Sequence, residues 1–440
     1  MQELQLSIDI LKDIHENGTL FNEALKKKFQ TDVSIRPLRK DVAGLVGCEL
    51  RHDILFAFLL KDFGLGDDEY FAAALLLGDA YFYKRVSLEA LSSAVKELVG
   101  EEKFAKVEPL LDKGGENPTY IPDDIKQGSV EYLSLRYNTP LWVLKIWNHF
   151  GYGNMYKSLR KNIRPSAPSL RARYSVLDKE VVENNPDFIK TAIEGIYAYQ
   201  GKEPLRKLDW VRSGKMFVEK AGIKAIFDQY KISEPMEAFL YGNNDQALKE
   251  LVESYGDSIG LNLGVSDSLD SHVEVSRLIK EKDLHNVNFF SAASDALEAY
   301  ITRQQDLVIA MPSSSEFDSI RENPDFFVHL KQDSLDGLLS GQAKLLEDLA
   351  PHVAEHGKLV YLVLTMNKKE GHYAVFEFLK NHPEFKLEKE EQLFPYNGLD
   401  TTAYYAVLSK DPDLAKASPS VGGLDIAEAG EPCACAAKEE

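Results

Sequence analysis

Three consecutive serines, Ser313 to Ser315, follow the apolar segment Leu307–Met311, which we expect to form a strand. A serine at the end of a strand could act as a nucleophile, but it needs a nearby base to accept its proton. His329 is the one histidine close by in the sequence. We therefore interpret the serines as a turn at the edge of a sheet.

A possible ligand-binding turn follows the expected strand Met236–Leu240, where Gly242 could bring backbone N–H groups close to an anionic or polar ligand. A lone glycine is equally typical of an ordinary strand-to-helix turn, which is the favoured interpretation. Asn262, in the next expected strand, Ser258–Leu263, occupies the place where an acid normally binds ribose hydroxyls. Charge-assisted hydrogen bonds are roughly twice as strong as neutral ones, so an amide predicts a weakened nucleoside site.

The densest run of unopposed positive charge lies between Asn154 and Leu177, a stretch without acids. Pro165 and Pro168 keep its backbone extended and could present the cations as a strip. A solvated surface and a nucleic-acid contact are both compatible with this pattern. The cations are Lys157, Arg160, Lys161, Arg164, Arg171 and Arg173.

The overall charge limits the possible partners. The formal net charge is −19 over 440 residues, and phosphate contacts dominate nucleic-acid affinity, so RNA binding requires a local basic patch. The Cys433/Cys435 pair near the end lacks a second pair of ligands, so we expect no metal, and the three cysteines provide no disulfide framework.

Hydropathy indicates neither a membrane protein nor a secreted one. The longest apolar runs, such as Tyr70–Leu77, are far shorter than the roughly 20 residues that span a bilayer. The N-terminus carries acids and no basic region, unlike a signal peptide. We therefore expect a cytoplasmic protein.

The elements that position these residues change along the chain. Apolar residues at helical spacing fill residues 1–130, which predicts an all-α domain. From about residue 231 strands alternate with helices, which predicts an α/β domain with a mostly parallel, doubly wound sheet over 231–410. The other expected strands are Val287–Phe290, Lys358–Leu364 and Tyr404–Leu408, and the tail 411–440 is expected to be disordered.

The stretch Leu339–Phe385 resembles the RsmB-type (Fmu/Sun) family of S-adenosylmethionine-dependent RNA cytosine-5 methyltransferases. The family's helix, glycine turn, strand Leu-Val-Tyr-Ala-Thr-Cys-Ser and next helix align there without gaps. Asn323-Pro-Asp325 is similar to the family's His-Pro-Asp, and the segment from Gly398 to Lys410 is similar to its closing Gly-Phe-Phe-x-Ala strand.

The resemblance extends upstream with less specific motifs. The segment Thr139–Arg173 resembles the part that precedes the catalytic domain and contacts RNA. The helical first 130 residues are similar to the NusB-like domain of this family. The resemblance therefore implies a NusB-like domain (1–130), a linker and RNA-contacting subdomain (131–230), and a Rossmann-like methyltransferase domain (231–410).

The departures from the family lie where its chemistry is expected. The resemblance implies that one cysteine thiolate adds to cytosine C6 and that a second helps release the product; Leu364 and Ser313 stand at those two positions. Leucine forms no covalent adduct, and serine without a base is a poor substitute for a thiol. Ala310 occupies the position of the acid in the motif that contains the second cysteine.

The cofactor positions depart as well. The family's Pro-Gly-Gly-Lys aligns with Tyr241-Gly242-Asn243-Asn244, so the second glycine and the lysine are lost, and Asn262 replaces the ribose-binding acid. Three hypotheses remain: a catalytically inactive protein that binds RNA or the ribosome, a working methyltransferase with other residues, or a protein-interaction module that binds neither S-adenosylmethionine nor RNA. The sequence slightly favours the first.

Overall fold

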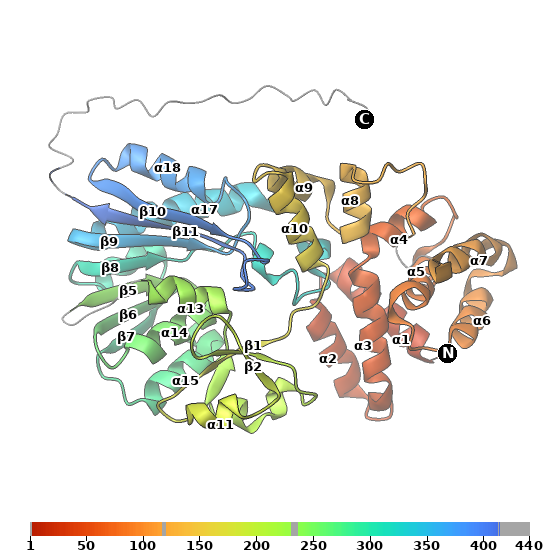
Figure 1. Ribbon diagram of the computed structural model, residues 1–440, viewed down its shortest axis with the longest axis horizontal. Helices are drawn as coiled ribbons and strands as arrows, with labels where there is room; N and C mark the ends of the chain where they lie inside the picture. The colour runs from red at the N-terminus through yellow and green to blue at the C-terminus, as the bar shows by residue number, and fades with distance from the viewer. Residues whose placement is uncertain (1, 117–119, 230–235, 412, 414–440) are drawn as a thin grey trace.

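The computed structural model describes residues 2–116, 120–229, 236–411 and 413. It confirms the predicted α/β class: a helical N-terminal region lies beside a sheet flanked by helices (Figure 1). The predicted disorder of the tail and the role of Cys433 and Cys435 concern residues outside this description. No helix within the described ranges is long and apolar enough to cross a membrane.

The N-terminal region is formed by helices alone, because its apolar residues recur at helical spacing and point to one shared core. Ile14, Leu45, Phe56 and Leu75 come from four different helices and are almost completely buried in it. Its likeness to a NusB domain stays a prediction. The α-helices are α1 (Gln2–Asn17), α2 (Phe21–Thr31), α3 (Arg39–Leu50), α4 (Asp53–Leu60), α5 (Asp67–Gly78), α6 (Leu88–Val99) and α7 (Glu101–Glu116).

Three further helices, α8 (Val130–Tyr137), α9 (Leu141–Asn148) and α10 (Tyr152–Asn162), connect this region to the sheet. Trp147 of α9 is fully buried and its ring stands edge-on to Phe317, with 5.4 Å between the ring centroids. The middle helices therefore share a core with the loop that follows a central strand.

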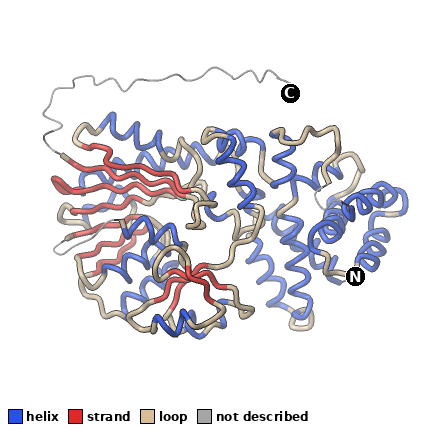
Figure 2. Tube along the Cα trace, viewed as in Figure 1, coloured by secondary structure: helices blue, strands red, loops and turns tan. Residues whose placement is uncertain are grey.

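A small antiparallel sheet of order β2-β3-β1-β4 follows (Figure 2). Its strands are three or four residues long, too short for an alternating pattern to be recognised in the sequence. They are β1 (Ser169–Ala172), β2 (Phe188–Lys190), β3 (Ile196–Tyr199) and β4 (Met216–Val218), with the short helices α11 (Lys179–Glu183) and α12 (Asp209–Arg212).

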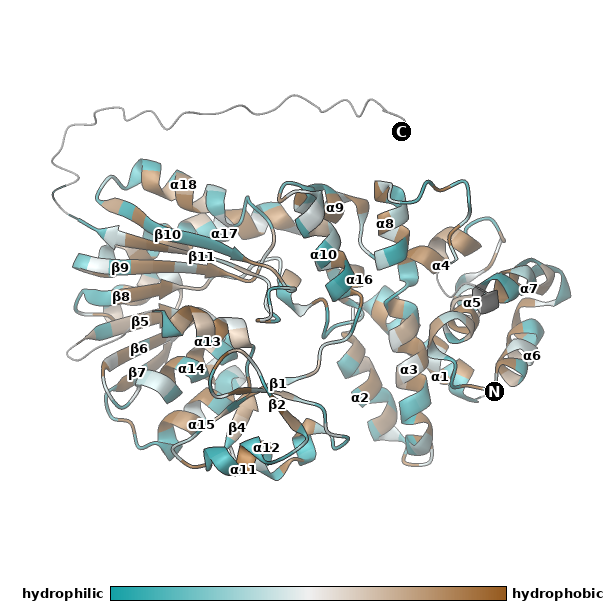
Figure 3. Cartoon of the chain, in the orientation of Figure 1, coloured by the Kyte–Doolittle hydropathy of each residue, from teal (hydrophilic) through white to brown (hydrophobic). Residues whose placement is uncertain are grey.

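The main sheet has the order β10-β11-β9-β8-β5-β6-β7. Neighbours from β9 through β7 run parallel, whereas β11 is antiparallel to both β9 and β10. Hydrophobic residues colour its central strands brown in Figure 3, as expected for strands covered on both faces. The strands are β5 (Glu237–Tyr241), β6 (Gly260–Val265), β7 (Val287–Ser291), β8 (Gln305–Ala310), β9 (Val353–Val363), β10 (Phe385–Leu393) and β11 (Ala403–Lys410).

Helices pack on both faces of this sheet, as predicted for a doubly wound fold. One face shares a core with α13 (Ala221–Asp228), α14 (Asp245–Tyr255) and α15 (Val273–Glu281). The other shares a core with α17 (Ser334–Leu349) and α18 (His372–Asn381), while the short α16 (Phe326–His329) packs beside Trp147. The domain boundaries stay predictions, although α13 already packs on the sheet before residue 231.

Candidate functional site

The predicted ligand-binding turn lies at the carboxyl edge of the main sheet, directly after β5. A side chain at Gly242 would collide with the carbonyl oxygen of Met311, which follows the neighbouring strand β8. The Gly242 backbone N–H donates to the carbonyl of Gly264 at 3.0 Å. The close approach of two chain segments therefore accounts for this glycine without a ligand.

The two asparagines of this turn have structural partners. The Asn244 side chain accepts a hydrogen bond from the Ala247 N–H at 3.0 Å and caps the N-terminus of α14. The Asn243 amide donates to Ser266 Oγ at 2.7 Å and accepts from the Ser266 N–H at 2.9 Å. This pair of bonds ties the turn after β5 to the residue that follows β6.

The structure corrects the predicted location of Asn262. The sequence placed it at the end of its strand, but β6 continues to Val265, so Asn262 lies inside the sheet. Its amide donates to Gln305 Oε1 at 3.0 Å and accepts from Asn288 Nδ2 at 3.1 Å. The residues at the carboxyl end are Ser266 and the exposed Asp267, which the sequence reasoning missed because it ended the strand two residues early.

The space beside this turn is small. A hollow of about 260 Å³ lies between the turn, the residues after β8 and the helix α17. Pockets that take small molecules commonly measure roughly 300–1,000 Å³. Its lining includes Tyr241, Gly242, Asn243, Ser266, Met311 and Ser313.

The positions that correspond to the two cysteines differ in their surroundings. Leu364 is 6% exposed and packs in the apolar core on the α13–α15 face of the sheet. Ser313 is exposed, and its carbonyl accepts a hydrogen bond from Gln342 Nε2 at 3.0 Å. Ala310, at the position of the acid, is fully buried. None of these three side chains carries an ionisable group.

A buried carboxylate organises the loops around these positions. Glu370 has no exposed surface, and its Oε2 accepts from the Ser315 N–H at 2.7 Å and from Gln342 Nε2 at 3.2 Å. Its Oε1 accepts from Thr365 Oγ1 at 2.9 Å and from Asn367 Nδ2 at 3.1 Å. The loop after β8 and the loop after β9 are therefore held together by one side chain.

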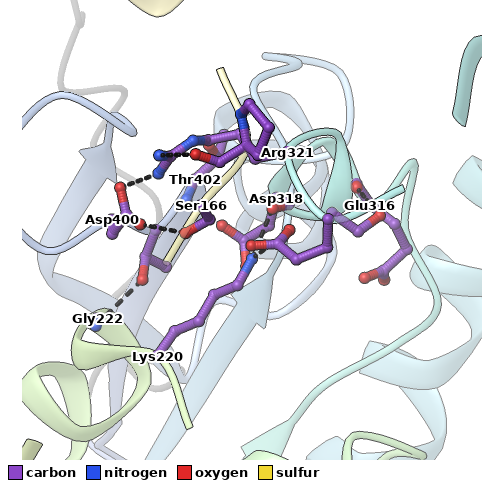
Figure 4. A network of polar contacts seen from close by, with 12 residues as sticks. Ser166, Lys220, Gly222, Glu316, Asp318, Arg321, Asp400 and Thr402 are labelled. Atoms are coloured by element: carbon purple, nitrogen blue, oxygen red, sulfur yellow. Dashed lines mark hydrogen bonds and ion pairs between the residues drawn. The ribbon is translucent and has the colours of Figure 1, made fainter. Parts of the chain in front are cut away.

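A second polar network joins distant segments at the same edge of the sheet (Figure 4). Lys220 Nζ lies 2.8 Å from Asp318 Oδ2, and Asp318 Oδ1 accepts from the Thr402 N–H at 2.5 Å. Burial lowers the pKa of Lys220, but the charges of Asp318 and Glu322 outweigh it, so the net shift is upward. In the same network Arg321 forms an ion pair with Asp400. These contacts fix the loop after β8 against the start of β11.

A larger cavity of about 740 Å³ lies where α2 of the helical region faces the loop after β8. The Phe21 N–H donates to Asp325 Oδ2 at 2.8 Å, which joins the two regions at the cavity wall. Burial raises the pKa of Glu316, another wall residue, to about 7, although a hydrogen bond from Ser314 opposes the shift. His329, the histidine considered as a base for the serines, lies in this wall and contacts Asp325 at 3.0 Å.

The predicted basic strip does not form one continuous surface. Arg173 is buried and pairs with Glu253 at 3.0 Å and with Glu281 at 3.2 Å, and Arg171 pairs with the buried Glu250 at 3.0 Å. These acids lie on α14 and α15, so the two arginines attach the small sheet to the main domain.

The remaining cations of the strip lie on and just after α10. Lys161 pairs with Asp400 at 3.1 Å, whereas Lys157, Arg160 and Arg164 are exposed. The strip is therefore corrected to a smaller group of cations on α10 and in the residues just after it.

A second set of cations, which the sequence did not reveal, lies close to these. A pocket of about 510 Å³ between α9 and the loop after β9 is lined by several cations and aromatic rings, together with Asp333 and Asp336. It was missed because its two halves are more than 200 residues apart in the chain. The basic and aromatic lining residues are Trp142, Lys145, His149, Lys368, Lys369 and Tyr373.

A row of ring contacts connects this pocket to α10. Lys368 Nζ lies 5.5 Å from the centre of the Phe150 ring, and Phe150 packs edge-on against Phe394 at 5.7 Å. Phe394 stacks on Tyr396 at 5.4 Å, and Lys157 Nζ lies 5.4 Å from the Tyr396 ring. We call this surface, from Lys157 through these rings to the pocket, the basic–aromatic face.

Two known proteins with sequences similar to this chain are both named ribosomal RNA small subunit methyltransferase B. The chain is 25% identical over 278 residues to the probable ribosomal RNA small subunit methyltransferase B of Bacillus subtilis, covering 60% of each chain. It is 35% identical over 77 residues to the ribosomal RNA small subunit methyltransferase B of Thermus thermophilus, covering 18% of this chain and 19% of that one. The chain thus spans about 60% or less of the length of these relatives. No protein-family model matches it.

Solved structures share the fold. The crystal structure of PH0851 aligns over 93% of this chain and 98% of its own with a TM-score of 0.71 and 18% identity. NSun6 from Pyrococcus horikoshii, solved with SFG, aligns over 62% of this chain and 98% of its own with a TM-score of 0.52 and 10% identity. At such low identities the likeness establishes the fold alone.

Proposed function

We propose that this chain, a relative of the RsmB-type (Fmu/Sun) methyltransferases, binds RNA through its basic–aromatic face and does not transfer a methyl group. The observation that carries the proposal is the combination of unreactive side chains at both cysteine positions with a surface of cations and rings. Ribosomal RNA is the expected ligand, because the curated relatives are named for it.

The absence of catalysis is supported by the surroundings of Leu364. Its side chain packs in a hydrophobic core, so the position is part of the packing of the sheet as well as chemically inert. Ser313 lies on the surface, and its side-chain oxygen has no hydrogen bond to a base among the described residues. A serine in that setting is not activated as a nucleophile.

The turn after β5 does not fit S-adenosylmethionine in the way that the resemblance implies. The Asn244 oxygen caps a helix, and both polar atoms of the Asn243 side chain bond to Ser266, so these three groups already have structural roles. Asn262 is turned to its neighbours inside the sheet, so Asp267 is the polar side chain left at that strand end to meet a ribose, and the adjacent hollow is small. Calorimetry with S-adenosylmethionine tests this part of the proposal: micromolar binding would favour the alternative of a working methyltransferase.

The basic–aromatic face has the composition of a surface for single-stranded RNA. Unstacked bases pack on aromatic rings, and lysines beside them neutralise phosphates. Trp142 and the half-exposed Tyr373 provide rings beside Lys145, Lys368 and Lys369. A local patch of this kind allows RNA binding in a chain whose net charge is strongly negative.

Fluorescence anisotropy with single-stranded fragments of ribosomal RNA at several salt concentrations tests the proposal. We expect Lys368→Gln with Lys369→Gln to weaken binding and to reduce the slope of log K against log salt by about 1.4, since each lost phosphate contact on a single strand removes about 0.7. Lys26→Gln with Lys106→Gln changes the charge equally at exposed sites of the helical region and should leave the slope unchanged. A slope near zero for the parent protein would refute the proposal.

The strongly acidic net charge favours a second candidate, a protein-interaction module that binds neither ligand. Affinity capture of the full chain with and without ribonuclease separates the two. Partners that persist after ribonuclease treatment, together with a flat salt dependence, would support the interaction module.

A further inference from the structure

A group of three metal-ligand side chains, one of them completely buried, lies in the helical region, far from the basic–aromatic face in sequence. His15 near the end of α1, Glu49 near the end of α3 and Asp53 at the start of α4 each direct one ligand atom to the same point. These three atoms all lie within 4.8 Å of one another. Three helices therefore supply one nitrogen and two oxygen donors to a single place.

Several polar atoms of this group have no hydrogen-bond partner among the described residues. Glu49 is completely buried, and neither of its carboxylate oxygens accepts a hydrogen bond. The Nε2 atom of His15 is also buried without a partner. Asp53 has a single long contact, from Tyr70 OH at 3.4 Å. Buried polar atoms are almost always hydrogen-bonded, so several unpaired ones in one place indicate a further partner, for which an ion is a candidate.

Two neighbouring carboxyls at this point need either a proton or a cation between them. Two carboxylates that close together repel each other, and removing an unpaired carboxylate from water costs several kcal/mol or more. No lysine or arginine forms an ion pair with Glu49 or Asp53 in the part of the chain that the structure describes. A divalent cation would supply the missing positive charge and the missing partners together.

We propose that His15, Glu49 and Asp53 bind one first-row divalent cation, with zinc as the expected ion. One imidazole and two carboxylates match the ligands of zinc, and three protein ligands leave a position for water. Tetrahedral zinc lies about 2.1 Å from such donors and holds them about 3.4 Å apart. The three ligand atoms lie within 4.8 Å of one another, so side-chain rotations that bring them up to about 1.4 Å closer would complete the site.

The position of the site indicates a structural role. The ion would join the ends of α1 and α3 to the start of α4 and so hold together helices that are separate in sequence. His15 also packs against Phe71 of α5, with 5.3 Å between the ring centroids, so a fourth helix restrains its imidazole. Loss of the ion should therefore loosen the helical region while the α/β domain stays folded.

Metal analysis and thermal unfolding of the full chain test the proposal. The chain should carry Cys433→Ser and Cys435→Ser, because that pair could itself bind soft cations. After chelator treatment, we expect uptake of one Zn²⁺ per chain and a rise in the thermal midpoint. Co²⁺ should give visible absorption bands of a site with nitrogen and oxygen ligands.

Isosteric variants identify the ligands. His15→Gln and Glu49→Gln should each weaken Zn²⁺ uptake at least tenfold and abolish the thermal shift. His285→Gln is the matched control, since His285 is 88% exposed and lies 3.5 Å from Asp283. Absence of stoichiometric uptake by the parent chain, or full uptake by His15→Gln, would overturn the proposal. A Glu49→Gln chain more stable than a parent that binds no ion would identify a proton shared by the carboxyls instead.

Discussion

Replacing Glu370 by alanine removes the acceptor of four hydrogen bonds from the interior of the α/β domain. Two of the donors have other acceptors, because Thr365 Oγ1 lies 2.7 Å from Ser315 Oγ and Gln342 Nε2 also reaches the Ser313 carbonyl. The Ser315 N–H and Asn367 Nδ2 are left unpaired and buried. Each such donor costs about 1–3 kcal/mol, so we expect Glu370→Ala to lower the free energy of unfolding by about 4 kcal/mol.

Glu370→Gln should lower the free energy of unfolding by about half as much as Glu370→Ala. The glutamine amide retains one acceptor oxygen, but its NH₂ group faces donors whose hydrogen bonds the second carboxylate oxygen accepts in the parent chain. Exposed Glu377 on α18 provides the control, since its ion pair with Lys380 lies on the surface and Glu377→Ala should change stability by less than about 0.5 kcal/mol.

Urea unfolding followed by tryptophan fluorescence measures these differences. Trp147 reports on the region directly, because it packs on Phe317, two residues beyond Ser315. A Glu370→Ala chain within about 1 kcal/mol of the parent would show that the two loops are held by other contacts, and the reasoning about this network would be refuted.

Two further predictions concern single charges. Burial raises the pKa of Glu316 to about 7, so the folded chain favours its protonated form, and the resulting stability is complete below the unfolded pKa. About 3 kcal/mol of the free energy of unfolding is lost as pH rises through 7. Glu316→Gln should flatten this fall in stability between pH 5 and 8 in urea titrations, and an unchanged pH profile would contradict the prediction. Arg173→Ala should lower the free energy of unfolding by about 2 kcal/mol, because the buried Glu253 then keeps only its longer ion pair with Lys282 at 3.6 Å. Arg160→Ala, at an exposed site, should instead weaken RNA binding and leave the free energy of unfolding unchanged. Equal losses of stability for Arg173→Ala and Arg160→Ala in calorimetric unfolding would contradict this difference between the two arginines.

The sequence predicted the α/β alternation well, because β8 and β9 each end in a buried apolar run, Leu307–Ala310 and Leu359–Val363. It missed β10, whose sequence Phe-Lys-Leu-Glu-Lys-Glu-Glu-Gln-Leu is rich in charge. Such charges are typical of a strand at the edge of a sheet, where they discourage pairing with another chain. The four short strands β1 to β4 were missed because each is held by its neighbours more than by its own pattern.

The candidate site was predictable in part. The unreactive residues at positions 364 and 313 are evident from the sequence, but the strand end after Asn262 was placed two residues early, which put the wrong residue at the sheet edge. The basic run was misjudged for another reason. Its strongest partners, Glu253 and Glu281, are 80 and 108 residues away from Arg173, and charge counted along the chain does not reveal such pairs.

Glu370 also bears on how chains of this fold diverge. A carboxylate that accepts four hydrogen bonds holds the two loops together whatever residues stand at positions 364 and 313. Its presence in another member of the group is therefore no sign of methyl transfer. A thiol introduced at position 364 would in turn meet a core packed around leucine, so this position would need repacking before a thiol there could reach a substrate.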